Sequence, residues 1–387
     1  MGADFIKMVS DVQFERFNAH LTAAAKNQTA YGTFSGFVMK PSDAAYNVQS
    51  LLKRRLNVTC AIVLADVQAV ALRKLVDVPV ITLEDFPRFG EKNFPVKPQE
   101  IFFTNMLKHF SFVPYFARYG IETFEESGDE KFFSVMKHLP ELYSVYTTLG
   151  GDESKKVFCA TIKGRLTGKI SDYRFAPEAQ YFLEGFTPTT GDIAIDGGAY
   201  DGATAVAFAK CGAKVFAFEM DAANYQNCAA RIGRGAYDVL LENIGLSDKE
   251  SVESYSRYGA GSRRSVNGTQ KAQFIDLDTY VARKNLPRVD YIKLDIEGAE
   301  LDMLHGAAKT ITCCKPKMAI SAYHKLEDLW TLAPYIKSLR PDYEFEFRHY
   351  RIDCTDYLLD DEERALLKYF GLSCLVPTHC EYVLYCR

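Results

Sequence analysis

Residues 191–221 read GDIAIDGGAYDGATAVAFAKCGAKVFAFEMD, and this stretch decides the fold of the second half of the chain. A short apolar run at 193–195 ends in Asp196 and two glycines. An alanine-rich segment follows, and a second apolar run at 215–218 ends in Glu219. A strand, a glycine turn, a helix and a strand with a terminal acid form the first half of a nucleotide-binding α/β unit.

The loop of this unit differs from a dinucleotide-binding loop in glycine spacing and in charge. A dinucleotide fold uses G-x-G-x-x-G, whereas the spacing here is Gly198-x-x-x-Gly202, with Asp196 and Asp201 beside it. These carboxylates would repel a pyrophosphate. S-adenosylmethionine carries a sulfonium and an amino group and no phosphate, so acids near the loop favour it, and Glu219 suits its two ribose hydroxyls. The alternative is an ordinary strand, turn and helix in which Asp201 caps the helix.

Composition is that of an ordinary globular protein. Of 387 residues, 48% are hydrophobic and 25% charged, which favours two or three domains. A net charge of -4 indicates no nucleic-acid surface. No apolar run approaches the roughly 18 residues that cross a membrane. The first residues resemble no secretory signal, and the ten cysteines include no C-x-x-C pair, so we expect a cytoplasmic protein with reduced thiols.

An α/β fold in three parts is expected. Residues 1–125 form a smaller N-terminal α/β (Rossmann-like) accessory domain, because strands alternate with helices from about residue 30. Residues 126–175 form a helical, charged linker, and residues 176–387 form the second α/β domain. Nothing in the loops of the first domain identifies a ligand, so a scaffold or docking role is favoured over a nucleotide or nucleotide-sugar site.

Seven apolar runs of the second domain are expected to be strands. Between the third and the fourth lies an insertion, 251–280, expected to form a short hairpin followed by a helix capped near Asp278. In chain order the runs are DIAIDGG, KVFAFEMD, DVLLENIGLSD, VDYIKLDIEG, KMAISAYH, YEFEFRHY and EYVLYCR.

Polar side chains follow the first five of these runs. In an open α/β sheet, ligands bind beyond the carboxyl ends of the strands, at the point where the strand order reverses. The residues at these ends are therefore expected to share one edge of the sheet. They are Asp196, Glu219, Asn243, Asp295, Glu297, Tyr323 and His324.

From residue 181 to about residue 350 the sequence resembles the FkbM family of methyltransferases. The matching stretches are GDIAIDGGAYDG, VFAFEMDAANYQNC, LENIGLSD, DYIKLDIEGAELDMLHGA and KPKMAISAYH, of which KLDIEGAE is the most specific. The N-terminal α/β part lies outside this resemblance. The resemblance implies a seven-stranded class I methyltransferase (Rossmann-like) sheet with one antiparallel edge strand. It also implies transfer of a methyl group from S-adenosylmethionine, usually to a hydroxyl.

Residues expected to hold this cofactor follow the first three strands. Glu219 should bind the ribose, and Met220 should lie against the adenine. The others are Asp196, Gly198, Tyr200 and Thr204 for the methionine part, and Asn243 and Gly245 for the border of the adenine.

Methyl transfer to a hydroxyl needs alignment and a base. Alignment of acceptor oxygen, methyl and sulfur can contribute about 7–11 kcal/mol. Asp295, His324 and Glu297 are the candidate catalytic residues, and a histidine can take a proton at neutral pH. Two alternatives remain: Asp295 could cap the following helix, and His324 could be structural. The three side chains could also hold a divalent metal such as magnesium, although no metal is expected.

Arg263 and Arg264 lie in a glycine-flanked loop of the insertion and could bind a phosphate or carboxylate of the acceptor, or else be solvated. The sequence thus predicts an S-adenosylmethionine-dependent O-methyltransferase acting on a sugar or another small metabolite. The alternative is a non-catalytic binding or scaffold protein whose N-terminal domain recognises a nucleotide-sugar or a protein partner. An NAD-dependent oxidoreductase is disfavoured by the acids in the loop.

Overall fold

The computed structural model describes residues 3–21, 30–36, 40–53, 56–89, 98–103, 107–125, 129–353, 359–378 and 380–387. The chain divides into two compact units. The first comprises Met1–Lys137, Lys156–Phe175 and Tyr350–His379. The second comprises His138–Lys155, Ala176–His349 and Cys380–Arg387.

This division differs from the expected boundaries at 125 and 175. The stretch 129–167 is helical, as expected, but its members belong to different units. The corner between α7 (Leu139–Thr148) and α8 (Asp152–Thr167) is held to the second unit, because Gly150 N donates to the carbonyl of Phe345. The chain also returns to the first unit near its end, where Arg118 binds the carbonyls of Phe370 and Gly371.

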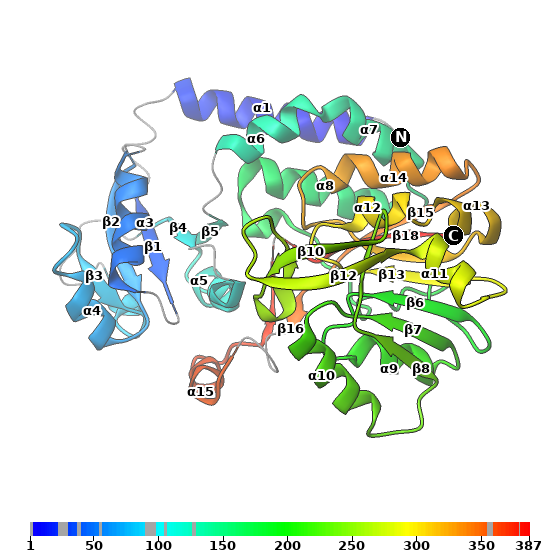
Figure 1. The fold of residues 1–387 in the computed structure, drawn as a ribbon. Coiled ribbons are helices and arrows are strands. Elements are labelled where there is room, and N and C mark those ends of the chain that lie inside the picture. The colour runs from blue at the N-terminus through cyan, green and yellow to red at the C-terminus, as the bar shows by residue number, and fades with distance from the viewer. Residues whose placement is uncertain are drawn as a thin grey trace. The chain divides into compact units, whose positions relative to one another are not determined.

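The first unit contains a five-stranded sheet in the order β3-β2-β1-β4-β5, and all of its strand pairs are parallel, as the alternating pattern predicts (Figure 1). Phe34 of β1 is fully buried against other aromatic rings. The strands are β1 (Tyr31–Ser35), β2 (Val58–Val63), β3 (Val80–Thr82), β4 (Glu100–Phe103) and β5 (Glu122–Glu125), with a two-stranded sheet of β16 (Ile352–Asp353) and β17 (Leu375–Val376). The helices are α1 (Ala3–Leu21), α3 (Pro41–Lys53), α4 (Asp66–Leu72), α5 (Val113–Ala117), α6 (Asp129–Lys137) and α15 (Asp361–Tyr369).

The second unit contains a seven-stranded sheet in the order β15-β18-β14-β13-β6-β7-β8 (Figure 1). Each of the seven predicted runs supplies one strand. The strands are β6 (Ile193–Gly197), β7 (Lys214–Phe218), β8 (Val239–Glu242), β13 (Tyr291–Leu294), β14 (Lys317–Ser321), β15 (Phe345–His349) and β18 (Tyr382–Cys386). The helices are α9 (Ala203–Lys210), α10 (Ala222–Ile232), α11 (Leu277–Arg283), α12 (Glu300–His305), α13 (Ala308–Cys314) and α14 (Asp328–Leu339).

One strand of this sheet is antiparallel, but it is not the edge strand that was expected. β18 pairs antiparallel with β14 on one side and with β15 on the other. All five of its residues are buried, which suits a strand with neighbours on both sides. The edge position is taken by β15, which runs in the same direction as β14.

The third predicted run divides after Glu242. Its second part, β9 (Gly245–Ser247), joins a separate four-stranded sheet in the order β11-β10-β12-β9. The predicted hairpin of the insertion is thus confirmed as part of a larger sheet. Its other strands are β10 (Ser251–Ser256), β11 (Arg263–Arg264) and β12 (Gln270–Asp276).

The helix of this insertion is capped near Asp278, as expected, and the capping residue is Asp276. Asp276 accepts a hydrogen bond from Thr279 N at 2.8 Å at the start of α11. Asp278 instead accepts from the amides of Lys309 and Thr310 at the start of α13.

The strand order of the large sheet reverses between β6 and β13. From β6 the chain continues outward through β7 and β8, and the later strands β13 and β14 are added on the other side. The carboxyl ends of β6 and β13 therefore border the crevice where ligands bind in such sheets. Within the described ranges, no helix combines the length and apolar character needed to cross a lipid bilayer.

Candidate active site

The ends of β6 and β13 lie in direct register. Asp196 is opposite Lys293, and Asp295 N donates to the carbonyl of Gly197 at 3.1 Å. The turn after β6 then passes so close to β13 that a Cβ on Gly198 would lie 1.8 Å from the carbonyl oxygen of Asp295. Gly198 also has a φ of +78°, so both its space and its backbone conformation require glycine.

We expect Gly198→Ala to lower the free energy of unfolding by about 2–4 kcal/mol, because left-handed strain adds to overpacking. Gly191→Ala is the matched control, since Gly191 has a φ of +84° but open space around its Cβ position. It should cost only about 1–2 kcal/mol. Urea unfolding of both variants measures the difference, and equal losses would show that the contact with Asp295 contributes nothing.

Glu219 follows β7 and ties the glycine loop to the neighbouring strand. Its Oε2 accepts from Tyr200 N at 2.9 Å, and its Oε1 accepts from Asp221 N at 2.8 Å. Only 6% of the residue is exposed, and burial raises the pKa of Glu219 to about 7. Each carboxylate oxygen has further lone pairs, so Glu219 can still accept hydrogen bonds from a ligand.

The predicted adenine-side residues come together next to Glu219. Asn243 Nδ2 donates to the carbonyls of Glu219 at 2.8 Å and Met220 at 3.3 Å. Met220 packs against the cluster of Tyr255, Ala272 and Phe274. Gly245 faces that cluster too, since a Cβ there would lie 2.4 Å from a ring carbon of Phe274. Their contact with an adenine stays a prediction.

Asp201 is not the N-cap of α9, which is Gly202, but its side chain binds the first amide of that helix. Its Oδ1 accepts from Ala203 N at 3.0 Å, and its Oδ2 pairs with Arg231 at 2.5 Å. Its charge is therefore balanced by an arginine of α10. Thr204 lies half-buried in the first turn of α9.

Asp196 is fully buried, and its Oδ1 lies 3.0 Å from the ammonium of Lys293. Lys293 was missed by reasoning from strand ends, because it lies inside β13. Its signal in the sequence is a charged residue within the apolar run YIKL, where burial requires a partner.

Asp295 is held by two tyrosines. Tyr181 Oη donates to its Oδ2 at 2.9 Å and Tyr323 Oη donates to its Oδ1 at 3.2 Å. Burial alone would raise the pKa of Asp295, but the charges of Lys293 and His324 and the hydroxyl of Tyr181 outweigh it and lower the pKa below its ordinary value. Asp295 is therefore ionised at neutral pH.

His324 is surrounded by carboxylates. Its Nδ1 lies 2.8 Å from Glu300 Oε1, while its Nε2 lies 3.4 Å from Asp295 Oδ1 and 3.5 Å from Glu297 Oε1. Burial would lower the pKa of His324, but these three carboxylates outweigh it and hold the pKa well above its ordinary value. An imidazolium has no lone pair with which to accept a proton.

Proton NMR should find the His324 ring still protonated at pH 7. Glu300→Gln should lower the midpoint of its titration, because the nearest carboxylate is removed. Glu327→Gln is the control, since Glu327 is an exposed carboxylate nearby in the sequence. A His324 midpoint that Glu300→Gln leaves unchanged would contradict the role given to Glu300.

Strained backbone gathers around this crevice. Among the described residues, six non-glycine residues have a positive φ, and four of these surround Asp295 and Glu219. Such conformations cluster at functional sites. The four are Tyr181, Tyr200, Glu297 and Glu381.

Glu381 was also missed in the sequence. It precedes β18, and an antiparallel strand presents its first residue at the edge where parallel strands present their last. Its Oε2 accepts from Gln180 Nε2 at 2.8 Å. Burial, and then the charge of Asp295, raise the pKa of Glu381 to about 7. The direction of β18 would have been the signal for this residue.

The two arginines of the insertion are not brought together. Arg263 and Arg264 are neighbours in β11, so their side chains point to opposite faces. Arg264 donates to Ser247 Oγ at 2.9 Å and is ion-paired with Asp302, whereas Arg263 is exposed. The loop before them does reach the crevice, because a Cβ on Gly261 would lie 3.8 Å from Glu297 Oε2.

The described residues include no group of three histidine, cysteine, aspartate or glutamate side chains arranged to hold a metal ion. Asp295, Glu297 and His324 do lie together, but as an ion-paired cluster with a protonated imidazole.

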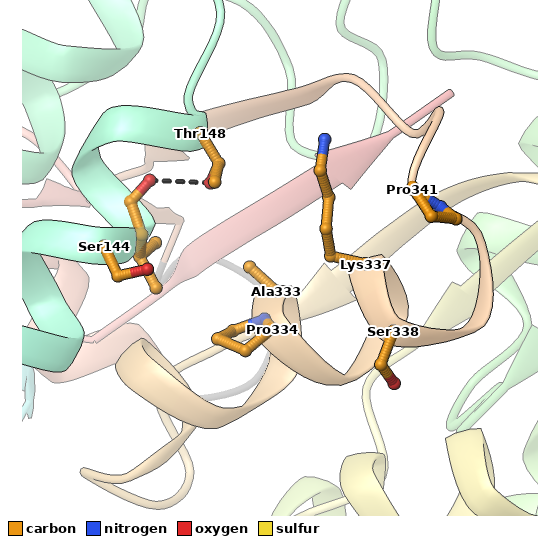
Figure 2. A pocket seen from close by; sticks show the side chains of 8 residues that line it. Ser144, Thr148, Ala333, Pro334, Lys337, Ser338 and Pro341 are labelled. Carbon is orange, nitrogen blue, oxygen red and sulfur yellow. Dashed lines mark hydrogen bonds between the residues drawn. The ribbon is translucent and has the colours of Figure 1, made fainter.

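A separate cavity of about 420 Å³ lies between α7 and α14 (Figure 2). α14 follows the carboxyl end of β14 and leads to the start of β15, so its last turn lies at the opposite edge of the sheet from Asp295. Lys337 in this cavity donates to the carbonyl of Tyr343 at 3.1 Å. The lining residues are Ser144, Val145, Thr148, Ala333, Pro334, Lys337, Ser338 and Pro341.

Residues 196–368 match the family model described as the Methyltransferase FkbM domain. This segment is an FkbM methyltransferase domain. It runs from the last residues of β6 into α15 and therefore includes most of the residues that line the crevice. The resemblance read from the sequence is thus confirmed. The model covers less than half of the chain, and residues 1–195 lie outside it.

One solved structure extends the likeness in fold beyond the FkbM domain. The crystal structure of Methyltransferase FkbM from Methylobacillus flagellatus KT covers 100% of this chain and 98% of its own, with 19% identity and a TM-score of 0.64. That likeness shows a shared fold that includes the N-terminal unit. A putative rRNA-methylase from Clostridium thermocellum covers 55% of this chain and 96% of its own, with 11% identity and a TM-score of 0.33. No curated protein matches the sequence.

Proposed function

We propose that the second unit transfers a methyl group from S-adenosylmethionine to a hydroxyl of a sugar or another small metabolite. The observation that carries the proposal is Glu219. A buried carboxylate binds the main chain of the glycine loop at the point where the strand order reverses, and it keeps lone pairs for two ribose hydroxyls.

The charges of the crevice suit this methyl donor. The donor supplies an activated methyl group on a sulfonium. Carboxylates of Asp295 and Glu297 lie at the crevice edge, and a cation next to them is favoured. The backbone amides of the loop are already bound to Glu219 and to the carbonyl of Phe218, so the loop lacks the amide cradle that a pyrophosphate needs.

We assign to Asp295 the role of binding the acceptor hydroxyl and taking its proton. His324 is an imidazolium in this cluster, so its part is to fix the neighbouring carboxylates, and the proton acceptor is Asp295 or Glu297. Asp295 adjoins Gly198 and is oriented by two tyrosine hydroxyls. A carboxylate so held can accept a hydrogen bond from the acceptor hydroxyl and align its oxygen.

Isothermal titration calorimetry with S-adenosylhomocysteine tests this proposal without a known acceptor. Thermal unfolding with S-adenosylmethionine or with NAD separates a methyltransferase from an oxidoreductase, because a ligand at 100 times its Kd adds about 2.7 kcal/mol of stability. No binding of S-adenosylhomocysteine to the folded protein would overturn the proposal and favour a binding or scaffold role.

A further inference from the structure

Lys293 is a charged residue in the interior of the large sheet. It is the third residue of β13 and only 2% exposed. A buried ammonium is costly unless its donors and its charge are matched. The reason for a lysine at this place must therefore lie in what it contacts.

This ammonium forms one ion pair and donates two hydrogen bonds. Nζ lies 3.0 Å from Asp196 Oδ1, and it donates to the carbonyls of Gly197 at 3.1 Å and Gly198 at 2.7 Å. The ring of Tyr181 lies 5.4 Å away on another side. Burial would lower the pKa of Lys293, but Asp196 and then Asp295 outweigh it and raise the pKa, so the ammonium stays charged.

These contacts fix two successive peptide planes of the glycine loop. The carbonyls of Gly197 and Gly198 point to Lys293. The amides of the same two peptide groups, Gly198 N and Ala199 N, donate to the carbonyl of Phe218 at 3.0 and 2.9 Å. Each plane is held at its oxygen by β13 and at its nitrogen by β7. Neither plane can rotate without losing a hydrogen bond at one end.

We propose that Lys293 is a positioning residue for the methyl donor, because it holds the loop after β6 in the conformation that binds the donor. Asp196 balances the charge of Lys293 and does not contact the donor. This inference rests on the proposed function. It differs from the direct contact expected for Asp196 from the sequence. That side chain has 0% exposure, so it presents no surface to a ligand in the crevice.

The experiment compares the Kd of S-adenosylhomocysteine by calorimetry with urea unfolding in four proteins. These are the wild type, Lys293→Met, the double variant Asp196→Asn with Lys293→Met, and Lys317→Met. The single Lys293 variant leaves the Asp196 charge buried and alone, so it should be unstable. The double variant removes that charge and should recover much of the stability. Lys317 is the control, because on neighbouring β14 it also binds a carbonyl, that of Thr187, and pairs with Asp192.

We expect the double variant to bind S-adenosylhomocysteine about tenfold or more weakly despite its recovered stability, because the charged hydrogen bonds to the loop are lost. Lys317→Met should keep the wild-type Kd. Wild-type affinity in the double variant would overturn the inference and leave the proposed function standing. Absence of binding in the wild type would overturn the proposed function, and the inference with it. An equal loss of affinity for S-adenosylhomocysteine in Lys317→Met would overturn the inference, because Lys293 would then act only through the overall stability of the protein.

Discussion

Glu219→Ala should abolish the binding of S-adenosylhomocysteine, with a Kd at least about a hundredfold weaker, since two hydrogen bonds to a charged group are worth roughly 1.5–3 kcal/mol each. The substitution removes the acceptor for the ribose hydroxyls. It also leaves the amides of Tyr200 and Asp221 without the carboxylate that orients them. Calorimetry measures the loss directly.

Glu242→Ala is the control for this result. Glu242 ends the next strand, β8, but its carboxylate binds Tyr280 and Lys284. It should lose stability without losing affinity. Retained binding in Glu219→Ala would remove the ribose contact and, with it, the observation on which the proposed function depends.

The same carboxylate predicts a pH dependence of binding. The ribose hydroxyls need the ionised form, and the pKa of Glu219 is raised to about 7. Affinity should therefore fall as the pH drops from 8 to 6, by up to about tenfold, because one pH unit below its pKa an acid is about nine-tenths protonated. Asp328 and Glu381 also have a pKa raised to about 7. Glu219→Gln isolates the effect, and a pH dependence that persists in this variant would belong to another group.

The strands of the large sheet can be predicted from the sequence because each strand is encoded by neighbouring residues. Each strand is a short apolar run, and each of the seven runs forms a strand. The parallel order and the reversal beside β6 then bring the strand ends together, so Asp295 and His324 meet as expected. Such reasoning succeeds because one topological rule sends the carboxyl ends of parallel strands to one edge.

Sequence reasoning misses residues whose role depends on the direction and position of a strand or on a contact with a residue far away in the sequence. Glu381 reaches the crevice because the antiparallel strand, β18, lies between β14 and β15 and not at the expected edge. Lys293 stands inside a strand, and its role appears only with the loop carbonyls across the sheet. Arg264 is held by Asp302. The unit boundaries also could not be predicted, since residues 350–379 return to the first unit.

Asp295→Asn should spare cofactor binding and lower the rate of methyl transfer by about 10²–10⁴-fold, the usual contribution of a group that takes a proton in the transition state. The side chain keeps its shape, and the loop contact at Gly198 involves the main chain of residue 295. The amide, however, cannot take a proton from the acceptor, and it can accept a hydrogen bond at only one of its two ends. The rate is measured as S-adenosylhomocysteine released from S-adenosylmethionine with an acceptor found by screening neutral sugars and metabolite extracts.

Two further variants show whether a lower rate in Asp295→Asn reflects the loss of a base. Tyr181→Phe removes one hydroxyl that orients Asp295 and keeps the carboxylate, so it should lose less rate than Asp295→Asn. Glu297→Gln tests the rival base, whose Oε1 lies 3.5 Å from the same imidazolium nitrogen. A normal rate in Asp295→Asn together with a large loss in Glu297→Gln would transfer the role to Glu297. A normal rate in both would mean that the acceptor hydroxyl loses its proton to solvent, and that the carboxylates serve to attract the sulfonium.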